Sequence, residues 1–350
     1  MDYAEVQAAF LAAPPPGRPA PRVPEGPARR LRDAAEPIAT VGFWGRPAYD
    51  ALAELGLEFL TGYVWGRTAP MGEPAAPVVV AAFGVFEPGL VTSLYEQARG
   101  LCTRAQVLAA REAGAVASLH ELLPDVPTGE VAAAVALLRR ATDLAAADVA
   151  GRPLFAGLTS LPWPQDPLGR LWHATNLLRE YRGDVHQATN VAAGLTGVQM
   201  NLVTEYWIGW EPTAYAGTRG WSPEAMAAAD ADLVDRGWVA DQALTPAGQR
   251  HRDEIEARTD AAMDRVLAAV GTRPDRADRP AGRLVRAGRR GRGRPARPVQ
   301  AGQRLTAAPP PSRAVLPGRR PALGGWRSAD GGWSDRPALP TVGSVPVPPP

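Results

Sequence analysis

The sequence predicts a mainly α-helical protein, in which a multi-helix N-terminal domain precedes a small C-terminal domain of two helices around a short β-hairpin. Apolar residues recur at helical spacing through most of the first 220 residues, and helix caps occur between these segments. Nothing before Gly220 has the alternation of apolar and polar residues that is typical of a strand. The first 200 or so residues are therefore expected to be entirely helical.

Composition divides the chain into four parts. Residues 1–33 are rich in Pro and Arg and predict a flexible leader, residues 34–219 predict the helical domain, and residues 220–270 predict the C-terminal domain. Residues 271–350 are rich in Pro and Arg and lack an apolar period. They predict either a disordered basic tail or a segment translated in a shifted reading frame.

Charge is distributed unevenly along the chain. Every one of its 38 basic residues is an arginine, and the net charge is +2. Residues 271–350 contain 16 Arg and 4 Asp, which leaves 22 Arg against 32 acidic residues in the part that is expected to fold. An acidic folded part disfavours nucleic-acid binding, because phosphate contacts need basic residues on the surface.

Cysteine usage and hydropathy indicate a cytoplasmic protein. The lone Cys102 excludes a disulfide within the chain, which fits a reducing compartment. The N-terminus lacks the basic region of a signal peptide, and no apolar run is long enough to cross a membrane. We therefore expect no membrane association.

Several helix starts can be located from their caps. Thr103 and Gln106 form a capping box before a helix that runs through Leu123. Asp166 is a good N-cap, and Pro167 suits the first helical position. Gly183 is expected to end that helix and Asp184 to begin another, which continues to about Trp207.

The C-terminal part has an ordered series of signals. Ser222-Pro223-Glu224 begins a helix that ends near Asp235, a turn at Arg236-Gly237 leads into a short hairpin, and Thr245-Pro246 opens a long helix over 249–269. Over residues 220–262 this order resembles the winged helix (a helix-turn-helix with a short β-hairpin) of MarR-type regulators. The resemblance implies binding of duplex DNA, with Arg236 and Arg250 as contacts. The helix that would enter the groove, however, carries four acidic residues and no basic one.

The chain from about residue 34 to 267 is also similar to an actinobacterial helix-turn-helix family known under the SalBIII name. The similarity lies in these segments: Gly62-Tyr63, Gly66-Arg67-Thr68-Ala69-Pro70, Leu161-Pro162-Trp163-Pro164, Leu171-Trp172-His173, Leu178-Arg179-Glu180, Arg182-Gly183-Asp184-Val185-His186, Gly220-Trp221-Ser222 and Glu256-Ala257-Arg258-Thr259-Asp260.

The helix that begins at Pro167 carries the best candidate for a site. Arg179 and Arg182 fall on its apolar face, so each must be paired internally or bind an anion. Glu87 and Glu205 are the internal partners we consider, and a guanidinium group that extends to solvent is the other possibility without a ligand. The alternative is a small-molecule ligand, possibly anionic, in a pocket lined by Tyr63, Arg67, Trp163, Trp172, His173, Arg179, Arg182 and His186.

Three functions remain open at this point. The first is a regulator or ligand-binding protein that responds to a small molecule. The second is an enzyme of secondary metabolism in which His173 and Glu180 act as an acid–base pair. The third is a structural partner that forms a homodimer through 249–269. His173 and Glu180 are seven residues apart, which is poor spacing for one metal ion, so no metal or cofactor is expected.

Overall fold

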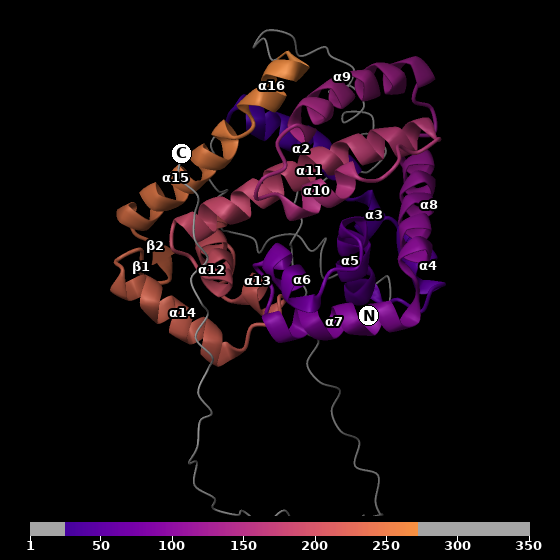
Figure 1. The fold of residues 1–350 in the computed structure, drawn as a ribbon. Helices are drawn as coiled ribbons and strands as arrows, with labels where there is room; N and C mark the ends of the chain where they lie inside the picture. Colours follow the sequence, from indigo (N-terminus) through magenta and orange to yellow (C-terminus); the bar gives the residue numbers. More distant parts are fainter. Residues whose placement is uncertain (1–24, 272–350) are drawn as a thin grey trace, which may run out of the picture. The chain divides into compact units, whose positions relative to one another are not determined.

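The computed structural model describes residues 25–271, which form helices joined by short loops and one two-stranded hairpin (Figure 1). No other strand occurs in this part of the chain, so the all-helical expectation for the first 200 or so residues is confirmed from residue 25 onward. The rest of the expected leader, residues 1–24, and all but the first residue of the expected tail, 272–350, lie outside the described residues. The elements in chain order are α2 (Pro27–Ala39), α3 (Val41–Trp44), α4 (Arg46–Ala53), α5 (Phe59–Thr68), η1 (Ala69–Met71), α6 (Ala76–Phe83), α7 (Pro88–Leu101), α8 (Arg104–Leu122), α9 (Thr128–Ala146), α10 (Pro153–Thr159), α11 (Pro167–Ala192), α12 (Gly197–Ile208), α13 (Ala214–Gly217), α14 (Pro223–Asp235), β1 (Val239–Ala240), β2 (Ala243–Leu244), α15 (Pro246–Ala261) and α16 (Asp264–Val270).

Helix α11 is the central element of the structure. It packs against α2, α8, α9, α10 and α15, and its 26 residues span about 39 Å. Its start is as predicted, because the Asp166 side chain accepts hydrogen bonds from the N–H groups of Leu168 and Gly169, and Pro167 is the first helical residue. Leu171, Trp172 and Leu178 lie in the core that α11 shares with α2, α9 and α16.

The prediction that Gly183 ends this helix is wrong. Helix α11 continues without interruption to Ala192. Asp184 does not cap a new helix, because its carboxylate accepts the Phe155 N–H, 2.9 Å away, at the start of α10. A glycine inside a helix costs only about 1 kcal/mol, which the burial of α11 against its neighbours outweighs.

Residues 27–33, for which composition predicted part of a flexible leader, form the start of helix α2. Helix α2 begins at Pro27, and residues 28, 29 and 35 are already buried. Arg29 explains why proline and arginine content misled the prediction, since its side chain is only 4% exposed and pairs with Glu256 of α15. Tertiary contact thus orders a segment whose local sequence predicts flexibility.

A second core lies between α5, α6 and α7, and helix α8 packs beside it against α4. Trp65 and Tyr95 are the largest buried side chains of this core. The capping box of α8 is confirmed, because Thr103 and Gln106 exchange hydrogen bonds at its start. Helices α4 and α8 approach closely at Gly114, where a Cβ atom would lie 2.5 Å from the Cα of Ala48.

The third core joins α12 to the C-terminal elements. It contains residues from Leu195 to Ile255, so it begins upstream of the boundary expected at residue 220. Ser222 caps α14 as predicted, and β1 pairs antiparallel with β2, with Val239 opposite Leu244. Asp241 and Gln242 turn the hairpin with φ values of 50° and 56°, as a two-residue hairpin turn requires.

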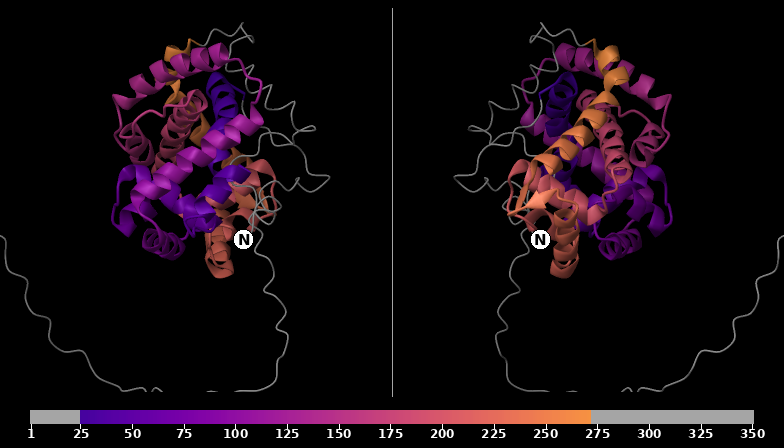
Figure 2. Two further views of the ribbon diagram at one scale, coloured as in Figure 1. Left: turned by 90° about the vertical axis from the view of Figure 1, so that its right-hand side faces the viewer. Right: turned by 90° about the vertical axis from the view of Figure 1, so that its left-hand side faces the viewer.

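The long C-terminal helix is divided in two. Helix α15 ends at Ala261, and α16 begins at Asp264 and lies beside α9 (Figures 1 and 2). Met263, Val266, Leu267 and Val270 belong to the same core as α11. Three apolar residues of the segment expected to form a homodimer, 249–269, are therefore buried within the chain: Met263, Val266 and Leu267.

The approach of α4 to α8 gives a first test. We expect Gly114→Ala to lower the free energy of unfolding by about 1–3 kcal/mol, because the new methyl group meets backbone atoms that cannot move aside. Gly100→Ala in α7 is the matched control, since a methyl group at this position would meet no atom within 4 Å, and it should stabilise by about 0.5–1 kcal/mol. Urea unfolding measures both. Equal effects would contradict the close approach.

Candidate functional site

A cavity of about 230 Å³ lies beside the C-terminal half of α11 and is lined by residues of α2, α5, α6, α11, α12 and α15. Its lining is rich in charge. We call it the α11 cavity. Seven arginines line it: Arg29, Arg32, Arg67, Arg179, Arg182, Arg219 and Arg252. Four acidic residues line it as well: Glu36, Glu180, Asp184 and Glu256.

The first ion-pair group of the cavity is centred on Glu180. Arg67 of α5 donates to both of its carboxylate oxygens, at 3.0 and 2.8 Å, and Arg179 donates at 2.6 Å. Arg179 also donates to Glu36 of α2 at 3.1 Å. Burial alone would raise the pKa of Glu180, but the charges of Arg67 and Arg179 outweigh it and lower the pKa to about 2. Glu180 is thus ionised and fully engaged at neutral pH.

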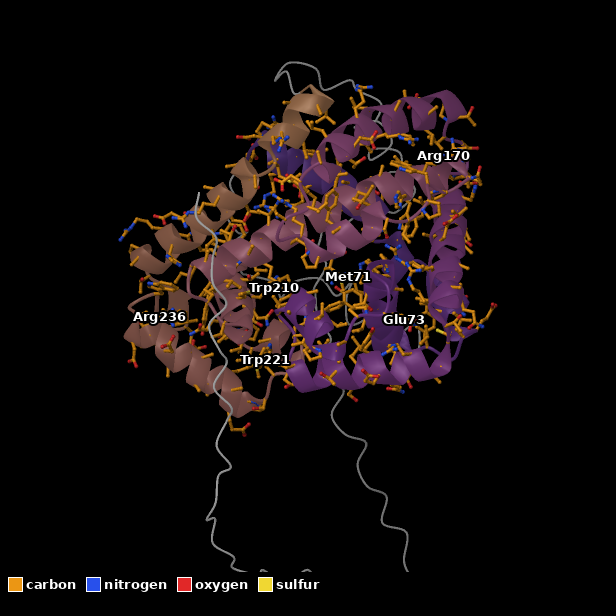
Figure 3. The ribbon with its side chains drawn as sticks, viewed as in Figure 1. Met71, Glu73, Arg170, Trp210, Trp221 and Arg236 are labelled. Carbon is orange, nitrogen blue, oxygen red and sulfur yellow. The ribbon has the colours of Figure 1, made fainter. Side chains whose placement is uncertain are left out.

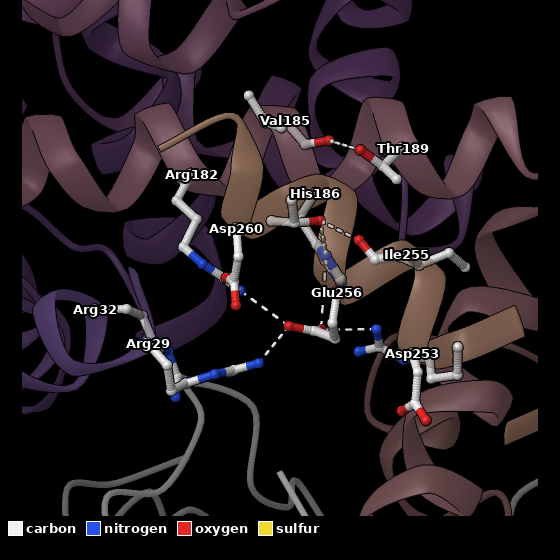
Figure 4. A network of polar contacts seen from close by, with 12 residues as sticks. Arg29, Arg32, Arg182, Val185, His186, Thr189, Asp253, Ile255, Glu256 and Asp260 are labelled. Carbon is white, nitrogen blue, oxygen red and sulfur yellow. Dashed lines mark hydrogen bonds and ion pairs between the residues drawn. The ribbon is translucent and has the colours of Figure 1, made fainter. Parts of the chain in front are cut away.

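The second group is centred on Glu256 of α15 (Figure 4). Its carboxylate receives three guanidinium groups: Arg29 from α2, Arg182 from α11 at 3.0 Å, and Arg252 at 2.7 Å. Arg182 also pairs with Asp260 at 2.9 Å. Burial would raise the pKa of Glu256, but Arg252 and the neighbouring cations hold it well below its usual range. The Glu256 carboxylate therefore connects α15 to α2 and α11.

Arg179 and Arg182 are paired internally, but not with the residues expected from the sequence. Glu87 instead caps α7, where its carboxylate accepts the N–H groups of Gly89 and Leu90. Glu205 accepts three backbone N–H groups around the start of α13. Both carboxylates accept hydrogen bonds from backbone N–H groups close to them in the sequence. The spacing of apolar residues gives no sign of these hydrogen bonds.

Burial shifts the pKa values of two further titratable groups of the cavity, Asp184 and His186. Burial raises the pKa of the Asp184 carboxyl to about 7, against the hydrogen bond from the Phe155 N–H and with the help of the Glu180 charge. Burial and the charge of Arg252 lower the pKa of His186 to about 3. The His186 Nδ1 atom lies 3.1 Å from the Thr259 hydroxyl.

Of the eight residues predicted to bind a ligand, five line the cavity: Tyr63, Arg67, Arg179, Arg182 and His186. The other three lie nearer the start of α11 and do not line it. Trp172 donates to the Ala39 carbonyl at 3.2 Å, and His173 packs edge-on against Trp163 with ring centroids 5.0 Å apart. Seven helical positions separate His173 from Glu180 by about 10 Å along the axis, so they form no acid–base pair.

His173 also has the wrong protonation behaviour for a proton shuttle at neutral pH. Burial, with a smaller effect of Arg111, lowers its pKa to about 4. Its ring is only 3% exposed. His173 is thus a neutral core residue of α11.

Sequence reasoning missed four arginines of the lining, namely Arg29, Arg32, Arg219 and Arg252. For Arg252 a signal existed, because Glu256 follows it by four positions on one helix, a spacing that allows an ion pair. Arg29 and Arg32 lie in the segment whose composition predicts a flexible leader. Arg219 lies in a short loop after α13, where no periodic pattern exists.

The two residues predicted to contact DNA are exposed, and both lie beside the hairpin elements. Arg236 lies at the hairpin end of α14 (Figure 3), where it pairs with Asp232 at 2.7 Å and donates to the Gly194 carbonyl. Arg250 is in the first half of α15. Two of the acidic residues of α14 are engaged, since Asp230 accepts from the Tyr206 hydroxyl and Asp232 binds Gln199 and Arg236.

The described part of the chain offers neither a metal site nor a membrane-spanning helix. Within 25–271, no group of three or more His, Cys, Asp or Glu side chains has an arrangement that could hold a metal ion. None of the helices in this range is long and apolar enough to cross a membrane.

The convergence on Glu256 predicts a large effect of its neutralisation. Glu256→Gln should lower the free energy of unfolding by about 3–5 kcal/mol, because three buried guanidinium groups lose their shared counter-charge. Glu254→Gln, on the exposed side of the same helix, should change it by less than about 0.5 kcal/mol. Chemical unfolding of both variants measures the difference. A loss below about 1 kcal/mol for Glu256→Gln would contradict the network.

The raised pKa of Asp184 predicts a pH dependence. The folded protein holds a proton on Asp184 that the unfolded chain releases near pH 4, so this stabilising contribution is lost as the pH rises from about 4 to about 7. Asp184→Asn keeps an oxygen for the Phe155 N–H and cannot ionise. Its stability relative to wild type should therefore increase over that range, by up to about 1.4 kcal/mol per pH unit. Urea unfolding at several pH values tests this, with Asp143→Asn on the surface of α9 as control.

One of three comparisons with known proteins gives a match. A model of a helix-turn-helix family matches residues 28–296. No curated protein matches the chain, and no solved structure does. The family match begins one residue into α2 and includes all later described elements, so it spans both the α11 cavity and the hairpin. The chain belongs to this helix-turn-helix family.

Proposed function

We propose that this protein is a helix-turn-helix transcription regulator whose DNA binding responds to a small molecule in the α11 cavity. One observation carries the proposal. The cavity is lined by Met200 and Asn201 of α12 and by Arg252 and Glu256 of α15, and these two helices share a core with α14 and the hairpin. An occupant of the cavity thus contacts the elements that hold the DNA-binding segment.

Glu256 provides the coupling in this proposal. It connects α15 to α2 and α11 through Arg29 and Arg182, and both arginines also line the cavity. A polar ligand that takes hydrogen bonds from these guanidinium groups competes directly with Glu256. The position of α15 then depends on whether the cavity is occupied. A ligand shifts such an equilibrium only by its difference in affinity for the two positions.

We further propose that α14, the hairpin and α15 act as a winged helix of MarR type. The hairpin is short, and the side chains of α14 that are exposed include no basic residue: Glu224, Ala227, Ala228, Ala231, Val234 and Asp235. Acidic side chains are repelled by phosphate, so α14 supplies little electrostatic attraction. Phosphate contacts in this proposal come from Arg236 and Arg250 on either side of the hairpin.

Salt dependence of DNA binding by the full chain tests this assignment. The Arg236→Ala, Arg250→Ala double variant should bind randomised duplex DNA more weakly, and the slope of log K against log salt should be smaller by about 2, since each lost phosphate contact removes about 0.9. Arg140→Ala on the exposed side of α9 is the control and should leave the slope unchanged. Both proteins keep the arginines of residues 271–350, so a difference in slope comes from the substituted positions alone. An unchanged slope in the double variant would overturn this DNA interface.

A further inference from the structure

Arg219 differs from every other arginine of the α11 cavity. The other six each have a carboxylate within ion-pair distance: Asp33 for Arg32, Glu180 for Arg67, Glu36 and Glu180 for Arg179, Glu256 and Asp260 for Arg182, and Glu256 for Arg29 and Arg252. Arg219 has none among the described residues. Its guanidinium donates to the neutral Thr218 hydroxyl at 2.6 Å, and its buried Nε atom has no partner.

The burial of Arg219 makes this lack of a counter-charge important. The residue is only 5% exposed, and its guanidinium carbon lies 4.0 Å from the ring centroid of Tyr215 and 4.9 Å from that of Phe86. Arginine remains charged inside proteins, because its pKa is above about 12. A buried charge without a partner is costly, whereas a bound anion would remove that cost.

The carboxyl group of Glu205 does not fill this role. Glu205 is close enough for the Arg219 charge to affect its pKa, yet its oxygens accept the N–H groups of Thr213, Tyr215 and Ala216. Burial raises the pKa of Glu205 to about 7 despite these hydrogen bonds. Glu205 therefore serves the backbone around α13 and offers Arg219 only a weak counter-charge.

The cavity contains two more polar groups with unused hydrogen-bonding capacity, on Tyr63 and Asn201. The Tyr63 hydroxyl accepts a hydrogen bond from Arg67 at 2.8 Å, and no acceptor for its own proton is present among the described residues. Asn201 is 1% exposed, its Nδ2 donates to Val85 and Gly197, and its Oδ1 atom is buried without a donor. All three residues line the same cavity. Together they offer a cation, a donor and an acceptor, next to the apolar rings of Phe83 and Phe86.

We propose that Arg219 anchors the carboxylate of a small hydroxy acid in the α11 cavity. This inference rests on the proposed function, because it names the ligand of the same cavity. The carboxylate accepts hydrogen bonds from the planar guanidinium of Arg219 and from the Tyr63 hydroxyl. The hydroxyl of the ligand donates to Asn201 Oδ1. The apolar part of the ligand lies against Phe83 and Phe86, and a volume of about 230 Å³ admits a body of one aromatic ring.

Calorimetric titration of the full chain with mandelate tests the proposal, because mandelate carries a carboxylate, a neighbouring hydroxyl and one ring. Wild type should bind mandelate at least tenfold more tightly than mandelamide, which has the same shape without the charge. It should bind phenylacetate, which lacks the hydroxyl, several-fold more weakly than mandelate. Equal binding of acid and amide, or no binding of mandelate, would overturn the anchor. Equal binding of mandelate and phenylacetate would overturn the role of Asn201.

Two variants assign the charge requirement to Arg219. Arg219→Gln should weaken mandelate binding about 10- to 100-fold while leaving the affinity for mandelamide unchanged. Arg99→Gln is the matched control, because Arg99 also lies over a tyrosine ring, 5.3 Å from the centroid of Tyr95, but pairs with Glu73 outside the cavity. Wild-type affinity of Arg219→Gln for mandelate would overturn the proposal. If Arg219→Gln does not fold, the comparison of mandelate with mandelamide binding to wild type still tests the need for a carboxylate.

The same samples separate this inference from the proposed function. Mandelate binding that leaves DNA retention unchanged would support the Arg219 anchor and contradict the ligand-responsive regulator. DNA binding through Arg236 and Arg250 without any binding of mandelate would retain the DNA-binding part of the proposed function and overturn the anchor.

Discussion

The structure depends on the pairing of arginine with carboxylate inside the helical core. Helix α11 can be buried along most of its length only because Glu180, Glu36 and Glu256 neutralise the arginines that its sequence places on inward-facing positions. Burying such a charge without a partner costs several kcal/mol. The pairs also determine which helices meet, since each joins α11 to a helix far from it in the sequence.

Burial raises the pKa values of the acidic groups of the cavity, and the charges of neighbouring arginines lower them. Glu180 and Glu256 have lowered pKa values because arginines surround them, whereas Asp184, one turn further along α11 than Glu180, has a raised pKa because burial dominates. Carboxyl groups with lowered and raised pKa values therefore lie on successive turns of α11. The difference between these pKa values depends on which arginines lie next to each carboxyl group. Arg219 is the one arginine of the cavity that has no carboxylate partner among the described residues.

The helix-turn-helix elements and the cavity belong to one connected structure. Helix α12 contributes to the core beneath α14 and also to the wall of the cavity, and α15 does the same through Ile255 on one side and Glu256 on the other. This arrangement differs from a DNA-binding module attached by a flexible linker. In the proposed function, a ligand in the cavity would act on α15 through these contacts.

Local chemistry in the sequence determined where many helices begin. Asp166, Ser222 and the pair Thr103–Gln106 cap their helices as predicted, because capping involves residues within one turn. The sequence also indicated that arginines on the face of α11 needed partners. Only the tertiary structure decided the partners themselves, the continuation of α11 through Gly183, the order of α2 and the isolation of Arg219. These features depend on residues as far apart as Arg29 and Glu256, and spacing along one helix carries no information about such contacts.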